Sequence, residues 1–181
     1  MYRIVLAFIL LAFAFEAGAT EAGWALLREG EHVVLLRHAH APGMADPADF
    51  DIEKCSTQRN LSERGRQQAR KVGALFAARA APTQRVLTSR YCRTRETARL
   101  AFRDAEDSPL LDPPAADGEE RQAQIEAIVA EVANYSGSGN LVLVTHLETI
   151  EAVTGQTARE GEAVIVRPDG ERLRVIGRIV F

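Results

Sequence analysis

Three short apolar runs constrain the fold of this chain more than any other feature. They are His32–Arg37, Arg85–Thr88 and Leu141–Thr145. Runs of this length are typical of strands that are buried on both faces of a parallel sheet. Between and after them, apolar residues recur at helical spacing, so strands and helices alternate along the chain. Helices are predicted from a cap at Ser62 to about Ala80, from about Cys92 to Phe102, around residues 125–132, and from Leu147 to Val153.

The last part of the chain has a different pattern. Residues Ala163–Arg167 and Arg172–Phe181 alternate between apolar and polar side chains around Pro168-Asp169-Gly170, which is a hairpin signal. The proline-containing segment 103–118 is predicted to be a loop, and the long polar segment 39–60 is a candidate functional loop. We therefore predict an α/β fold, a three-layer α/β/α sandwich with a mostly parallel central sheet and a C-terminal antiparallel hairpin.

Length and composition indicate one globular domain. The chain has 181 residues, of which 46% are hydrophobic and 26% are charged, a balance that allows a buried core and disfavours disorder. The formal net charge of -3 provides no general positive field, so we expect no nucleic-acid partner. Any site for an anion must be a local cluster of cations.

The first 19 residues are predicted to be a secretory signal peptide. Arg3 precedes the apolar stretch Ile4–Phe15, which is too short to span a membrane, and the small residues Ala17-Gly18-Ala19 suit a signal peptidase. The domain is then residues 20–181, located in the periplasm or otherwise exported, with no stable membrane insertion after cleavage. A short uncleaved anchor and a buried first helix are the alternatives.

Export affects the interpretation of the two cysteines, Cys55 and Cys92. In an oxidising compartment such a pair more often forms a structural disulfide than two free thiols or half of a zinc site. We therefore predict a disulfide between Cys55 and Cys92, with two unpaired buried thiols as the alternative.

The polar residues of the predicted strands gather where each strand ends. Arg37-His38 ends the first run, Ser89–Arg93 follows the second, and Thr145-His146 ends the third. Because the carboxyl ends of parallel strands meet at one edge of a sheet, we expect these residues to share a site. Arginines bind phosphate oxygens in a bidentate manner, and nearby cations keep a histidine neutral, so that its free nitrogen can attack phosphorus. The sequence therefore predicts a phosphoryl site.

The motifs that carry this chemistry also resemble a known family. In order they are Leu36-Arg37-His38-Ala39, the segment 60–69 (NLSERGRQQA), the segment 88–98 (TSRYCRTRETA) and Val144-Thr145-His146. In this order and context they resemble the histidine phosphatase superfamily, whose fold is phosphoglycerate mutase-like. With the segment 55–60 (CSTQRN), the chain looks most like the exported, compact subgroup that includes the lipopolysaccharide core heptose phosphatases.

The resemblance implies a role for four residues. His38 corresponds to the nucleophile, Arg37 and Arg93 to phosphate-binding arginines, and His146 to a second catalytic histidine that contacts the transferred group. It implies hydrolysis of phosphomonoesters in two steps through a phosphorylated His38, with no metal and no other cofactor. The expected substrate is a small phosphorylated molecule or a phosphorylated glycan, such as a phosphorylated sugar of the cell envelope.

The chain departs from the family at two glycine positions, which hold Ala39 and Leu147. Alanine still allows the backbone to approach a phosphate, whereas Leu147 is expected to narrow the rim of the pocket. The family's general acid has several candidates here, which are Asp112, Asp117, Glu119, Glu120 and Glu148.

Two other functions remain open at this point. A metal-dependent hydrolase could use His38, His40 and His146, because histidines spaced by one residue are a plausible fragment of a metal site. A non-catalytic phosphosugar-binding module is the other alternative, because a fold does not dictate an activity.

Overall fold

The computed structural model describes residues 20–181, which form a six-stranded sheet with the strand order β3-β2-β4-β1-β5-β6. Neighbouring strands from β3 to β1 run parallel, whereas β5 is antiparallel to β1 and forms a hairpin with β6. The strands are β1 (Val33–Arg37), β2 (Thr83–Thr88), β3 (Glu106–Asp107), β4 (Asn140–Thr145), β5 (Ala163–Asp169) and β6 (Arg172–Ile179).

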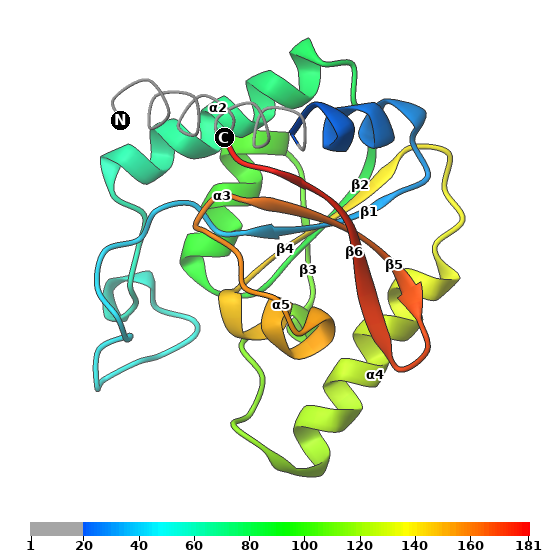
Figure 1. Ribbon diagram of the computed structural model, residues 1–181. Helices are drawn as coiled ribbons and strands as arrows, with labels where there is room; N and C mark the ends of the chain where they lie inside the picture. The colour runs from blue at the N-terminus through cyan, green and yellow to red at the C-terminus, as the bar shows by residue number, and fades with distance from the viewer. Residues whose placement is uncertain (1–19) are drawn as a thin grey trace, which may run out of the picture.

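Helices cover both faces of this sheet. Residues 20–29 are helical and lie with α2 and α3 on one face, and α4 and α5 lie on the other (Figure 1). The predicted three-layer sandwich is therefore confirmed. The longer helices are α2 (Glu63–Ala78), α3 (Cys92–Phe102), α4 (Gly118–Asn134) and α5 (Leu147–Thr154), with short 3-10 turns η1 (Cys55–Thr57) and η2 (Pro109–Leu111).

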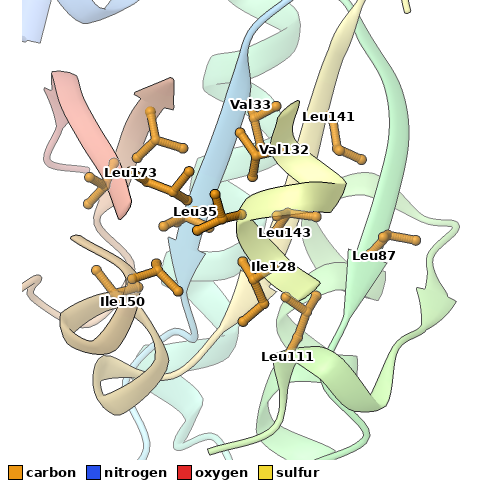
Figure 2. Close-up of a cluster of buried hydrophobic side chains, with 14 of the residues drawn as sticks. Val33, Leu35, Leu87, Leu111, Ile128, Val132, Leu141, Leu143, Ile150 and Leu173 are labelled. Carbon is orange, nitrogen blue, oxygen red and sulfur yellow. The ribbon is translucent and has the colours of Figure 1, made fainter. Parts of the chain in front are cut away.

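The alternation of side chains along β1 explains why both faces need a cover. Val33 and Leu35 belong to the cluster on the α4 and α5 side, which Figure 2 shows around Ile128 of α4. The residues between them, Val34 and Leu36, belong to the cluster on the other side. Successive side chains of a strand point to opposite faces, so a continuous apolar run requires two helical layers. Truncating one such leucine to alanine costs about 3 kcal/mol of stability.

Close backbone contacts fix where α2 begins relative to the loop that follows β1. The Ser62 side chain accepts a hydrogen bond from the Gly65 backbone N–H at 3.1 Å, which caps the helix as predicted. The position of Gly65 leaves no room for a side chain, because a Cβ there would collide with the carbonyl oxygen of His40. Glycine at 65 thus allows the helix to pack directly on residue 40, beside the predicted site.

Besides the two 3-10 turns, one strand and one helix were not predicted. The short strand β3 falls inside the segment 103–118, and it consists of two acidic residues, Glu106 and Asp107, that have no apolar periodicity. Arg85 of β2 pairs with Glu106 at 2.9 Å, and Arg95 of α3 pairs with Asp107 at 2.6 Å. These contacts come from distant parts of the chain, so a local pattern cannot reveal the strand.

The second unpredicted element is the helix at residues 20–29, in which Trp24 and Leu27 are buried in the core against α2. The predicted signal peptide, residues 1–19, lies outside the described residues. Within residues 20–181, the helices are all too short or too polar to cross a bilayer.

Candidate active site

The carboxyl ends of β1 and β4 bring the two predicted histidines together. The backbone N–H of His38 donates to the carbonyl of Thr145 at 3.0 Å, and the N–H of Ser89 donates to the carbonyl of Val144 at 3.0 Å. The ring centroids of His38 and His146 lie 5.6 Å apart. Their exposed fractions are only 2% and 0%. The sheet register therefore holds both rings at one buried position.

His38 has one ring nitrogen fixed and one free. Its Nδ1 lies 2.8 Å from the Ala39 carbonyl oxygen, which only accepts, so Nδ1 carries the proton and Nε2 has the lone pair. Burial lowers the pKa of His38 to about 4, and the charges of Arg93 and Arg37 lower it as well, against the opposing Ala39 hydrogen bond. A neutral ring with an unprotonated Nε2 is the form that a nucleophile requires.

The two predicted arginines lie beside these rings. Arg37 ends β1 in the same chain segment as His38, and its guanidinium donates to the carbonyl of Ala158 at 2.7 Å. Arg93 stands in the first turn of α3, is 3% exposed and pairs with Asp46 at 3.0 Å. Its guanidinium lies 4.6 Å from the centre of the Tyr91 ring. Burial lowers the pKa of Arg93, and the paired Asp46 opposes this shift.

A third arginine, Arg59, joins the site and was missed from the sequence. It comes from the long loop 39–60 and donates to the carbonyls of Ala41 and Gly43. Its charge contributes to the lowered pKa values of Arg93 and His146, which places it within electrostatic reach of both. The length of this loop was the available signal, because long loops without secondary structure are often functional.

In the described part of the chain, residues 20–181, the buried side-chain atoms that lack a hydrogen-bond partner all belong to this site. Within residues 20–181, the buried side-chain nitrogens and oxygens without a hydrogen bond are the Nε atoms of Arg37, Arg59 and Arg93, and Nδ1 of His146. Unpaired buried polar groups are costly and need an explanation such as a ligand. Three guanidinium N–H donors and a histidine nitrogen together suit a phosphoryl group.

Among the candidate acids, the structure brings Asp112 into contact with the site. Asp112 is 8% exposed and accepts hydrogen bonds from the Ser89 hydroxyl at 2.8 Å and from the Arg90 guanidinium and backbone N–H. Both carboxylate oxygens are therefore occupied. The other four candidates, Asp117, Glu119, Glu120 and Glu148, are exposed.

Another acid, Glu160, was missed from the sequence and lies near His38. It accepts hydrogen bonds from His40 Nδ1 at 2.7 Å and from the Ala41 backbone N–H at 3.2 Å. Burial raises the pKa of Glu160, but these hydrogen bonds outweigh burial and lower it. The His40 ring is therefore hydrogen-bonded to Glu160. Within residues 20–181, no three histidine, cysteine or acidic side chains form a group that could hold a metal ion, and His38, His40 and His146 do not form the alternative metal site.

The loop that carries Arg59 is attached to the start of α3. The predicted disulfide is present, and it joins Cys55 to Cys92 with their Cα atoms 5.6 Å apart. The Gln58 side chain accepts from the backbone N–H of Cys92 at 2.9 Å, and Asp46 accepts from the backbone N–H of Arg59 at 2.8 Å. These contacts hold Arg59 beside Arg93.

An open cleft of about 540 Å³ borders the site. Phe50 and Tyr91 line it and stack on each other, with ring centroids 5.1 Å apart. The Tyr91 ring also lies 4.8 Å from the ring of His146. Glu120 and Arg90 add polar groups to the lining. The cleft therefore lies beside the buried histidines, with the Tyr91 ring between its aromatic surface and His146.

Solved structures share this fold. The chain matches the phosphoglycerate mutase from Thermus thermophilus at 21% identity, over 83% of this chain and 99% of that one, with a TM-score of 0.57. It matches the protein histidine phosphatase SixA complexed with tungstate at 19% identity, over 82% and 96% of the chains, with a TM-score of 0.54. A candidate alpha-ribazole-5'-P phosphatase from Escherichia coli matches at 15% identity, over 82% and 96%, with a TM-score of 0.60. The fold is therefore phosphoglycerate mutase-like.

The sequence itself matches the model of a family. Residues 33–113 match the histidine phosphatase superfamily, branch 1. This range contains Arg37, His38 and Arg93, and it ends before His146. The resemblance of the chain to the histidine phosphatase superfamily is therefore confirmed. No curated protein matches the sequence significantly, and the likeness to heptose phosphatases stays a prediction.

Proposed function

We propose that this protein is an exported phosphatase that hydrolyses phosphomonoesters through a phosphohistidine on His38. The observation that carries the proposal is the set of unpaired buried nitrogens, on Arg37, Arg59, Arg93 and His146, around a neutral His38. The family match and the shared fold support the same activity class.

In the first step, Nε2 of His38 attacks phosphorus with its lone pair, a N–P bond forms and the ester P–O bond breaks. The electron pair of that bond goes to the leaving oxygen, which takes a proton from solvent and departs as the alcohol. The three arginines hold the equatorial oxygens and stabilise the charge that develops there. The Ala39 carbonyl accepts a hydrogen bond from the Nδ1–H of His38 and favours the positive charge that the ring acquires. In the second step, water attacks phosphorus and gives one proton to solvent, the N–P bond breaks with its electron pair returning to Nε2, and phosphate and the neutral ring are released.

The substrate is a phosphorylated sugar or glycan of the cell envelope. The open cleft beside His146 has room for a bulky leaving group, and the stacked rings of Phe50 and Tyr91 offer the flat apolar face on which sugar rings pack. The disulfide between Cys55 and Cys92 supports an oxidising, exported location, as does the signal-like sequence of residues 1–19.

The test combines kinetics with trapping of the intermediate. Wild type and His38→Ala are compared on para-nitrophenyl phosphate, with His32→Ala as a control outside the site. Mass spectrometry after rapid quenching at alkaline pH is expected to find one added phosphoryl group on the peptide that contains His38. Equal activity of wild type and His38→Ala would refute the assigned nucleophile, and an inactive wild type that binds phosphosugars would favour a binding module.

The substrate class needs a separate assay. Phosphate release is measured from isolated lipopolysaccharide, from phosphorylated hexoses and heptoses, and from para-nitrophenyl phosphate. We expect Phe50→Ala to lower kcat/KM on the glycan substrates more than on para-nitrophenyl phosphate. Equal losses on both would contradict the assignment of the aromatic cleft to the sugar.

A further inference from the structure

A buried chain of hydrogen bonds runs from Asp112 through Ser89 to His146. The Ser89 hydroxyl lies 2.8 Å from Asp112 Oδ1 and 2.8 Å from His146 Nε2. Ser89 and His146 are fully buried, and Asp112 is 8% exposed. No step of the proposed reaction uses Asp112, although its carboxylate lies two hydrogen bonds away from His146.

The donors and acceptors in this chain can be assigned from chemistry. Asp112 accepts from the Arg90 backbone N–H at 2.9 Å and from its guanidinium, so the side chain is a carboxylate that donates nothing. The single hydroxyl proton of Ser89 therefore points to Asp112. The Ser89 oxygen also accepts from the Tyr91 backbone N–H at 3.3 Å, which leaves one lone pair for His146. Nε2 of His146 must then be the donor.

This assignment determines what the other nitrogen of His146 carries. A neutral ring has one N–H, so Nδ1 bears a lone pair and no proton. Nδ1 is also one of the four buried atoms that lack a partner within residues 20–181. A bare lone pair repels a phosphate oxygen, whereas a protonated Nδ1 would donate a charge-assisted hydrogen bond to it.

The surroundings of His146 hold the ring neutral in the free protein. Burial is the largest cause of its lowered pKa, and the neighbouring cations lower it further. A bound dianion reverses this balance, because its two negative charges lie among those cations. Ser89 and Tyr91, which follow β2, face the ring, and Asp112, which follows η2, acts through Ser89. The other charged or titratable groups around it are Arg93 of α3, Arg59 of the loop, and Arg37 and His38 at the end of β1.

We propose that Asp112 and Ser89 hold His146 in the Nε2–H tautomer, so that binding of a phosphoryl dianion takes up one proton at Nδ1. Asp112 and Ser89 are positioning residues that act through His146, and the inference rests on the proposed phosphoryl site. The proton comes from solvent and adds to Nδ1 without breaking a bond. The resulting N–H donates to an equatorial oxygen, and the proton returns to solvent when phosphate leaves.

The first test measures the tautomer in the free protein by 15N NMR of histidine-labelled enzyme. The chain has four histidines, so His146→Gln suffices to assign the signal. We expect the Nε2–H pattern for wild type. In Asp112→Ala the acceptor of the Ser89 proton is lost, so this proton is free to point at Nε2 and the signal changes to the Nδ1–H pattern. An Nδ1–H pattern in wild type would overturn the proposal, whether or not the protein is a phosphatase.

The second test counts protons during the binding of tungstate, a dianion at about pH 8 that does not titrate there. Calorimetry in two buffers of different ionisation enthalpy is expected to give uptake of about one proton per tungstate for wild type and near zero for Asp112→Ala and Ser89→Ala. Asp169→Ala, the same change in an exposed acid at the end of β5, is the matched control and should retain the uptake.

The outcomes separate this inference from the proposed function. Tungstate binding without proton uptake by wild type would overturn the inference and leave the phosphoryl site intact. Loss of uptake in His38→Asn with uptake retained in Asp112→Ala would place the proton on His38 and also overturn it. Failure of tungstate to bind would count against the proposed function, while the tautomer measured in the free protein still decides the inference.

Discussion

The two sides of the candidate site are built in different ways. On the sheet side, His38, Ser89 and His146 follow strands β1, β2 and β4, and backbone hydrogen bonds of the sheet edge hold them. On the loop side, Arg59 and Asp46 come from a segment held by a disulfide and by side-chain hydrogen bonds. Arg93 lies between the sides, in the first turn of α3.

The two sides therefore have different tasks in the proposed reaction: one holds the reacting groups, and the other binds the negative charge of the phosphoryl group. In the proposed reaction the sheet side supplies the nucleophile and the second histidine, whose relative position must be accurate to a fraction of an ångström. The loop side supplies a cation, whose effect on a phosphoryl group declines more gradually with distance. A rigid sheet edge suits the positioning of the two histidines, and a loop held by a disulfide is adequate for placing the cation.

The largest expected effect concerns the sheet side. His38→Ala should lower kcat by more than about 10⁴-fold, because removal of a nucleophile leaves only binding and electrostatic stabilisation. Steady-state kinetics on para-nitrophenyl phosphate measure it, with tungstate affinity as the check that the site still forms. A loss of less than about tenfold would place the chemistry elsewhere.

Removal of the disulfide tests whether the geometry of the loop side depends on this bond. The bond spans 37 residues, and in the chain-entropy model replacing both Cys55 and Cys92 by serine costs up to about 4 kcal/mol of unfolding free energy. Urea denaturation measures the loss. We also expect weaker tungstate binding, because the bond ties the segment before Arg59 to the residue before Arg93. Unchanged tungstate affinity would show that the hydrogen bonds of Gln58 and Asp46 hold the loop alone.

The pH dependence of stability tests the sheet side again. Burial, aided by Arg93 and Arg37, lowers the pKa of His38 from 6.5 to about 4, so the unfolded chain binds more protons between these values. Stability should therefore fall as the pH drops from about 6.5 to about 4, by about 3 kcal/mol from His38 at most. In denaturation curves, His38→Gln should flatten this decline and His32→Gln should not. An unchanged slope in His38→Gln would contradict the burial effect.

The smallest of these effects concerns the third arginine. Arg59→Ala should lower kcat/KM by about 10²-fold, because one buried donor to the phosphoryl group is removed. Arg64→Ala, which changes an exposed arginine of α2, is the matched control and should leave kcat/KM unchanged. Equal kinetics of the two variants would exclude Arg59 from the site.

Much of the fold followed from local patterns. The apolar runs predicted β1, β2 and β4, and the predicted bounds of α3, Cys92–Phe102, agree with the structure. These elements were predictable because a strand that is buried on both faces reads as an apolar run, and a helix that is buried on one side shows apolar residues at helical spacing. The two-residue strand β3 left no such period, since ion pairs with Arg85 and Arg95 hold it.

Within the site, the residues at strand ends were predictable and those on loops were not. Arg37, His38, Arg93 and His146 all stand beside regular elements, and the structure brings them together as expected. Arg59 and Glu160 lie in loops whose path depends on distant partners, such as His40 for Glu160. Local patterns carry no information about such contacts.

The amino-acid sequence thus determined by itself the layered α/β fold and the edge of the sheet where the chemistry gathers, because periodicity and parallel strand order are encoded locally. Only the tertiary structure decided which buried nitrogens remain without partners, and that Asp112 reaches His146 through Ser89 rather than serving as an exposed acid. The physical reason is that a proton's position depends on every donor and acceptor around it, and folding collects these from segments far apart in the chain.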